Sequence, residues 1–340
     1  MTESHLPIPP HFQPRKVGEV WSVPYGELAE AAEKWAIRHR LSPANEDTFR
    51  VGLLLVDIQN TFCIPGFELF VRGQSGSGAV DDNCRLCQFI YRNLGRISRI
   101  VASLDTHNPI QLFHSVFLVD QDGSHPSPYT VISLEDIEGG RWRIDPQVCR
   151  ELKIEPDYGQ QHILRYTRQL RKEGKYDWTI WPYHALQGGI GHALVSAIEE
   201  AIFFHSLARK AQPRLVTKGT HPLTESYSAF GPEVQVDDQV DNLEPGKGGL
   251  VEVLAGLDML IVAGQAKSHC LAWTVRDLLE TGKVEASKVY LLEDCTSPVV
   301  VPGAVDYSDE AAAAFVRFNQ EGAHLVRSID PMDEWPGIMI

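Results

Sequence analysis

Short apolar runs recur along the chain, and longer segments with helical spacing separate them. The runs are continuously apolar, which is typical of strands buried on both faces of a mainly parallel sheet. They occupy 51–58, 97–105, 214–219, 258–264, 288–294 and 323–328. Helices are expected at about 81–95, 190–208, 268–281 and 307–321. The pattern predicts an α/β protein with a sheet of about six strands covered by helices.

Two stretches depart from this alternation. Residues 1–49 combine a proline-rich start with the segment GELAEAAEKWAIRHRL, which predicts an amphipathic helix. Residues 115–178 hold few apolar runs and several prolines, and a segment of that length is more than a connecting loop. We expect an extension over 1–49 that packs on a core domain over 50–340, with an insertion at about 115–178. Three roles stay open for the insertion: a lid, an oligomer contact or a surface excursion.

The charge balance limits the class of partner. The chain carries 45 Asp and Glu against 31 Lys and Arg, a net charge of −14, which disfavours binding to nucleic acid or anionic membranes. The sequence has no run of 18 apolar residues, the length that would indicate a membrane span. The N-terminus lacks the basic start and apolar core of a signal peptide. We therefore expect a cytoplasmic protein whose partner is a small molecule or another protein.

The cysteines favour a reducing environment. Six in 340 residues are few, and their spacing indicates no disulfide framework, so free thiols are expected. Cys84 and Cys87 form a CxxC pair, but they lie in a predicted helix and no second pair follows. Packing is favoured over a zinc site for both residues.

Polar residues collect where the predicted strands end, and ligands bind at the carboxyl ends of strands in open parallel sheets. Asp57 follows the first run. Its carboxylate either has a structural role, with hydrogen bonds to loop amides, or forms an ion pair. Asp105 and His107 follow the second run two residues apart, so both side chains point the same way and suit a shared metal. Lys218 ends the third run and either reaches water or pairs with an acid such as Asp57.

Cys270 lies where the run MLIVAG passes through QAKS into a predicted helix. A helix N-terminus presents free amides and a positive dipole end, which favour thiolate over thiol. A nearby ammonium from Lys218 would act in the same direction. The free amides would also hold the oxyanion formed when a thiolate attacks a carbonyl. The alternative is a small apolar residue that packs the helix.

The motifs together resemble the isochorismatase-like cysteine hydrolases, and within them the nicotinamidases. The matching blocks are LLLVDIQNTF, DTH, WPYHALQGGIG, TKGTHPLTESYSAF and VAGQAKSHC, in family order. Nicotinamidases typically show K-G-T followed by D-S-Y-S-x-F, and this chain has Glu225 in place of the Asp. The resemblance covers roughly 50–115 and 179–330. It implies a three-layer α/β/α sandwich and a homo-oligomer.

The resemblance also implies roles for individual residues. Asp57, Lys218 and Cys270 would form a catalytic triad, with Asp57 as the proton acceptor and donor. The amides of Ala266 and Cys270 would form the oxyanion hole, after a cis bond between Gln265 and Ala266. The residues implied to contact the substrate are Phe62 and Gln265, and those implied to hold a divalent metal, zinc first and iron or manganese as alternatives, are Asp105, His107 and His184.

The expected reaction is hydrolysis of the C–N bond of a small amide, nicotinamide first, through a thioester on the cysteine. The alternatives are a related hydrolase of an N-carbamoyl or ureido compound, or a non-catalytic member that acts as a binding protein. An isochorismatase is disfavoured, because those enzymes do not depend on a nucleophilic cysteine. The chain departs from the family at Lys267, Ser268 and His269, where T-D-Y or T-E-Y is usual, and at Ala185, where Cys is common. Three further histidines remain candidates as additional ligands: His114, His192 and His221.

Overall fold

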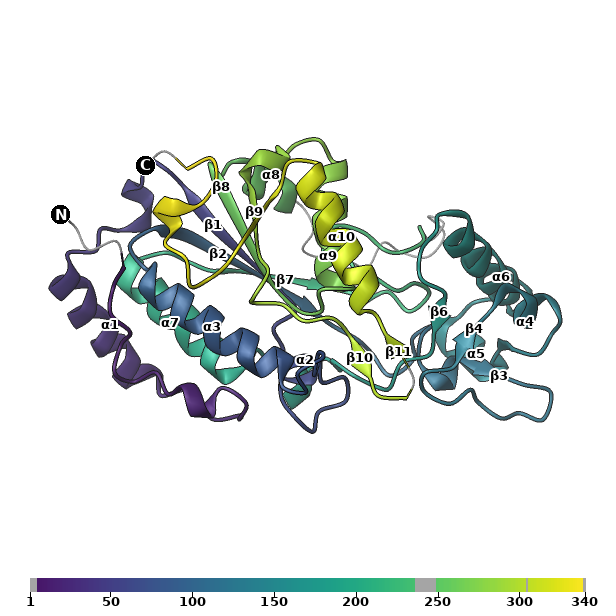
Figure 1. Cartoon of the computed structure of the whole chain (residues 1–340). Coiled ribbons are helices and arrows are strands. Elements are labelled where there is room, and N and C mark those ends of the chain that lie inside the picture. Colours follow the sequence, from purple (N-terminus) through teal and green to yellow (C-terminus); the bar gives the residue numbers. More distant parts are fainter. Residues whose placement is uncertain (1–4, 236–248, 304, 339–340) are drawn as a thin grey trace.

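The computed structural model of the chain describes residues 5–235, 249–303 and 305–338 (Figure 1). A single six-stranded sheet forms its centre, with the strand order β12-β9-β8-β1-β2-β7 and every neighbouring pair parallel. The strands are β1 (Val51–Val56), β2 (Ile97–Asp105), β7 (Arg214–Lys218), β8 (Met259–Gly264), β9 (Val289–Leu292) and β12 (His324–Val326). Each predicted run therefore forms a strand of one sheet.

Helices cover both faces of the sheet, which confirms the predicted three-layer α/β/α class (Figure 1). Within β1, Leu53 and Leu55 pack in the cluster on one face, whereas Leu54 and Val56 pack in the cluster on the other. This alternation explains why the strand needs apolar residues at every position. The helices are α1 (Tyr25–His39), α3 (Gly78–Arg92) and α7 (Ser196–Arg209) on the first face, and α8 (Leu250–Ala255), α9 (Cys270–Glu280) and α10 (Ser308–Gln320) on the second.

The helix expected at 190–208 begins later, at Ser196, because residues 190–192 form a separate 3-10 turn that continues in extended backbone. Helix α1, at the N-terminal end of the chain, packs along α7. Trp35 of α1 is buried and its ring lies 6.2 Å from the ring of Phe204. None of the helices in the described ranges is long and apolar enough to span a bilayer.

The segment after β2 builds a small hydrophobic cluster of its own, beside the sheet (Figure 1). Trp178 and Tyr166 are fully buried in it, and Leu223 and Val234 from beyond β7 complete it. Its elements are β3 (Leu118–Val119), β4 (Val131–Ile132), α4 (Leu134–Glu138), β5 (Arg143–Ile144), α5 (Pro146–Leu152), α6 (Pro156–Lys172) and β6 (Trp178–Thr179). The remaining elements are the short helix α2 (Asn60–Cys63) and the hairpin of β10 (Val300–Val301) and β11 (Val305–Asp306).

Candidate functional site

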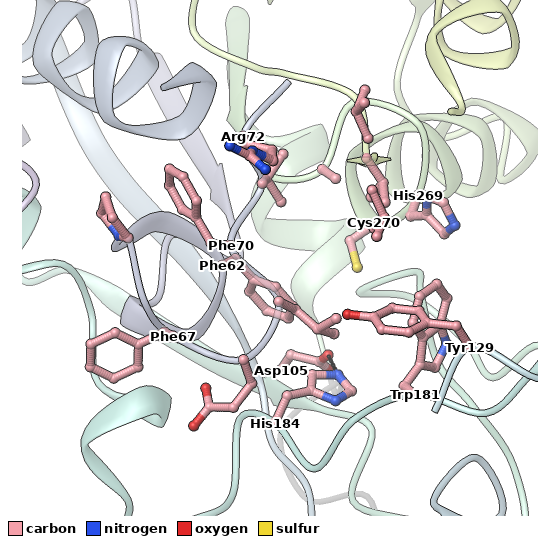
Figure 2. A pocket seen from close by; sticks show the side chains of 18 of the residues that line it. Phe62, Phe67, Phe70, Arg72, Asp105, Tyr129, Trp181, His184, His269 and Cys270 are labelled. Carbon is pink, nitrogen blue, oxygen red and sulfur yellow. Dashed lines mark ion pairs between the residues drawn. The ribbon is translucent and has the colours of Figure 1, made fainter. Parts of the chain in front are cut away.

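Four neighbouring strands bring reactive side chains to one edge of the sheet. Asp57 follows β1, Asp105 ends β2, Lys218 ends β7, and β8 leads into the loop before Cys270. Because β8, β1, β2 and β7 are adjacent and parallel, their carboxyl ends lie side by side. A pocket of about 520 Å³ opens at this edge, and Asp105 and Cys270 line it (Figure 2).

Lys218 is the centre of the polar cluster at the base of this pocket. Its side chain is fully buried, and its ammonium lies 2.9 Å from Asp57 Oδ2 and 3.0 Å from Asp105 Oδ1. It also donates to the carbonyl oxygen of Ser226 at 2.9 Å and to Cys270 Sγ at 3.6 Å. Asp57 is held from the other side by Ser103, whose hydroxyl donates to Asp57 Oδ1 at 2.6 Å. The structure thus brings Asp57, Lys218 and Cys270 into contact.

Burial and the neighbouring charges together set the pKa values of this cluster. It raises the pKa of the Cys270 thiol well above its ordinary value, and the Lys218 ammonium opposes that rise. Burial also raises the pKa of the Asp57 carboxyl, against the attraction of Lys218. For Lys218 itself, burial is outweighed by Asp105 and Asp57, which hold its pKa well above the ordinary value. The sequence favoured a thiolate at the helix start, whereas burial acts in the opposite direction and favours the thiol.

The loop before Cys270 presents two backbone amides that have no acceptor within the described part of the chain, those of Ala266 and Cys270. Cys270 is the first residue of α9, so its amide has no partner inside the helix. The peptide bond between Gln265 and Ala266 is cis. The sulfur of Cys270 points into the pocket in Figure 2. This arrangement suits the binding of a developing oxyanion.

Two glycines permit close approaches around the site. Gly264, at the end of β8, has φ +128°, and a Cβ there would lie 2.1 Å from the carbonyl oxygen of Val56. Gly219 follows Lys218 with φ +78°, and a Cβ there would lie 2.8 Å from Asp105 Oδ1 and 2.9 Å from His107 Nε2. A larger residue at Gly264 would clash with the backbone of β1, and one at Gly219 would displace the side chains of Asp105 and His107.

Three buried histidines offer ring nitrogens within 4.8 Å of one another: His107, His114 and His184. Asp105 borders them, with Oδ1 3.0 Å from His107 Nε2 and Oδ2 3.8 Å from His184 Nε2. His114 Nε2 is buried without a hydrogen-bond partner, and burial lowers the pKa of His114 to about 3. A neutral imidazole with an orphaned nitrogen, beside a carboxylate and two more imidazoles, fits a divalent metal.

The histidine set differs in part from the sequence expectation. Asp105, His107 and His184 come together as expected, and His114 joins them from the loop after β2. Of the other two candidates, His192 is 2.8 Å from the hydroxyl of Thr106, and His221 Nδ1 accepts the amide of Leu223 at 3.2 Å. Neither belongs to the group of three that the described residues form.

Of the two residues expected to contact the substrate, one lines the pocket and the other does not. Phe62 is buried in the pocket wall, 5.7 Å from the ring of His184. Gln265 instead turns away from the pocket: its amide donates to Asp82 Oδ2 at 2.8 Å, and its oxygen accepts the amide of Ser297 at 3.2 Å. A buried amide side chain needs both kinds of partner, and here they lie on the far side of the loop. Gln265 therefore fixes the loop before Cys270.

Sequence reasoning missed a second group of wall residues, which lie opposite Phe70 in Figure 2. Tyr129, from the segment between β2 and β7, and Trp181 both line the pocket. Trp181 Nε1 donates to Glu225 Oε1 at 2.8 Å, and burial raises the pKa of Glu225 to about 8. Trp181 and Glu225 stand in the blocks WPYH and TESYS, so the motifs contained this signal, but nothing marked Tyr129.

Known proteins resemble this chain in sequence and in fold. No family model matches the chain. The chain is 28% identical over 285 residues to the nicotinamidase of Escherichia coli strain K12, which covers 82% of this chain and 95% of that protein. Two solved structures share its fold. A nicotinamidase/pyrazinamidase from Acinetobacter has a TM-score of 0.51 at 21% identity, over 83% of this chain and 98% of that one. The yeast nicotinamidase bound to the inhibitor nicotinaldehyde has a TM-score of 0.52 at 17% identity, over 82% and 99%.

Proposed function

We propose that this chain is an isochorismatase-like cysteine hydrolase that cleaves the C–N bond of a small amide through a thioester on Cys270, an interpretation supported by its similarity to a nicotinamidase. Nicotinamide is the first candidate substrate. One observation carries the proposal: the Cys270 thiol, the Asp57 carboxylate and the Lys218 ammonium meet at the base of a pocket beside two unused amides.

The electrostatics of the cluster indicate the order of proton transfers in the reaction. Asp57 takes the thiol proton as Cys270 Sγ attacks the carboxamide carbon, and the amides of Ala266 and Cys270 hold the oxyanion. Asp57 then gives the proton to the departing nitrogen, so the C–N bond breaks and ammonia leaves. A water molecule cleaves the thioester with Asp57 again as the base. A raised pKa suits Asp57 to both accepting and donating, since the ideal catalytic pKa lies near the operating pH.

We also propose that His107, His114 and His184, with Asp105, hold a divalent metal. When bound, the metal would bind and polarise the ring nitrogen of a heteroaromatic amide. Histidine and carboxylate ligands suit zinc best, with iron and manganese as alternatives. Elemental analysis of the purified protein, before and after chelation, would identify the metal.

The deciding experiment measures ammonia release from nicotinamide, pyrazinamide and carbamoylated amines. We expect hydrolysis of at least one primary amide, and its loss in Cys270→Ala by a factor of about 10³ or more. Cys84→Ala, in helix α3, is the matched control and should keep full activity, because Cys84 lies outside the pocket. Full activity in Cys270→Ala would contradict the mechanism.

The panel also separates the two alternative functions. Turnover of carbamoylated amines alone would identify a ureido hydrolase. Binding without turnover, together with no selective alkylation of Cys270 by iodoacetamide, would identify a non-catalytic member.

Further proposals concern the whole chain. We keep the division into an extension over 1–49 and a hydrolase domain over 50–340 with an insertion at about 115–178. All six cysteines are free, which supports a cytoplasmic location because thiols stay reduced there; cell fractionation would test it. The homo-oligomer stays a prediction, and sedimentation velocity would test it.

A further inference from the structure

The pocket is larger than nicotinamide requires. Its volume is about 520 Å³. Nicotinamide has about nine non-hydrogen atoms, and even at the ~30 Å³ that a water molecule occupies in the liquid they fill about half of this space. Figure 2 shows Phe67, Phe70 and Arg72 across the pocket from Tyr129 and Trp181. This side has room for a substituent beyond the amide.

Arg72 is the only lysine or arginine among the described residues that line the pocket. Its exposed guanidinium makes no ion pair or hydrogen bond with the rest of the described chain. That is notable in a protein with 45 acidic and 31 basic side chains. An unpaired arginine fork at a pocket wall suits a planar anion such as a carboxylate, which it can bind through two parallel hydrogen bonds.

Backbone hydrogen bonds hold Arg72 against the pocket wall. The amide of Val71 donates to the carbonyl oxygen of Phe62 at 2.8 Å, so the residue before Arg72 is tied to the wall near Cys270. The carbonyl oxygen of Arg72 accepts the amide of Gly78 at 2.8 Å, at the start of α3. The origin of the side chain is therefore fixed before any ligand binds, which lowers the entropic cost of binding.

The acidic groups that line the same pocket already have partners. Glu68 accepts the hydroxyl of Thr61 at 2.9 Å. Glu225 accepts the indole of Trp181, and Asp105 contacts Lys218. These contacts turn the carboxylates toward protein donors, which leaves the positive charge of Arg72 available to a ligand.

We propose that the pocket also accepts amides that carry a carboxylate at the far end, and that Arg72 binds this carboxylate. The inference rests on the proposed amide hydrolysis. The amide carbon lies at Cys270, an apolar spacer runs along Phe62 and Phe70, and the carboxylate meets the guanidinium.

The test compares monoamides of straight-chain dicarboxylic acids, from succinic to suberic acid, with alkyl amides in which a methyl group replaces the carboxylate. At the best spacer length, we expect kcat/KM to be at least about tenfold higher for the carboxylated amide. Arg72→Gln should remove this advantage through KM. Arg72→Lys should keep part of the advantage, and added salt should reduce it.

Arg38→Gln is the matched control, since Arg38 is an exposed arginine on α1 outside the pocket and its loss changes the net charge equally. The inference is overturned if no length shows the advantage, or if Arg72→Gln keeps it. Should neutral amides be hydrolysed without any preference for the carboxylate, the proposed function stands and only this inference falls. If no amide is hydrolysed, both fall.

Discussion

Replacing Lys218 by methionine removes an ammonium that contacts both Asp57 and Asp105. Its nitrogen lies 2.9 Å from one carboxylate and 3.0 Å from the other, and all three side chains are buried. Methionine fills a similar volume, so the change leaves two carboxylates in apolar surroundings without this cation. Breaking a buried ion pair by removing one partner typically costs about 3–5 kcal/mol.

Protonation sets a ceiling on this cost. Asp57 can take up a proton in Lys218→Met, and protonating a carboxyl group with an ordinary pKa of 3.8 at pH 7 costs about 4 kcal/mol. The pKa of Asp57 is then raised further in the folded state, so the folded protein binds more protons than the unfolded chain above pH 4. The stability of the variant must therefore rise as the pH falls, by ~1.4 kcal/mol per pH unit.

Urea unfolding followed by tryptophan fluorescence, at pH 7 and pH 5, measures both effects. We expect Lys218→Met to lose about 3–4 kcal/mol at pH 7 and to regain most of it at pH 5. The double variant Lys218→Met/Asp57→Asn should be more stable than the single variant at pH 7. Lys34→Met, which breaks an exposed pair with Glu30, should change stability by under about 1 kcal/mol. A deficit that does not shrink at pH 5 would refute the reasoning.

Three further variants test other parts of the site. Gly264→Ala should lose more than about 3 kcal/mol of stability in urea, because its Cβ meets a carbonyl oxygen at 2.1 Å, whereas Gly26→Ala, with no atom within 4 Å, should lose none. Tyr176→Phe removes a 2.9 Å hydrogen bond to the carbonyl of Ser268, so kcat should fall a few-fold with KM unchanged. His114→Asn should weaken metal retention about tenfold or more in elemental analysis, and His192→Asn should not.

The sheet was predictable because its strands are buried on both faces. A strand such as β1, which packs Leu53 and Leu54 against opposite helix layers, requires a continuous apolar run, and that run is visible in one sequence. The parallel arrangement then places Asp57, Asp105 and Lys218 at one edge. Their convergence therefore follows from strand order, with no knowledge of the loops.

The parts that escaped prediction depend on side-chain direction in irregular segments. Tyr129 lies in a loop whose path is set by tertiary packing, so no periodicity marks it. His114 was a candidate ligand from the sequence, but nothing in the sequence separated it from His192 and His221. The direction of Gln265 depends on donors and acceptors supplied by Asp82 and Ser297 from distant parts of the chain. The burial that raises the pKa of Cys270 could not be predicted, because a helix position is readable from sequence whereas the depth of burial is not.

The pocket is built from two parts of the chain, the central sheet and the segment between β2 and β7. The chemistry stands on strand ends of the sheet, while Tyr129 of the wall and Tyr176, which holds the carbonyl before His269, stand on a unit with its own hydrophobic cluster. Mutations inside that cluster can therefore change the shape of the wall without replacing Asp57, Lys218 or Cys270. A change of substrate range and a change of the reacting groups thus require substitutions in different parts of the chain.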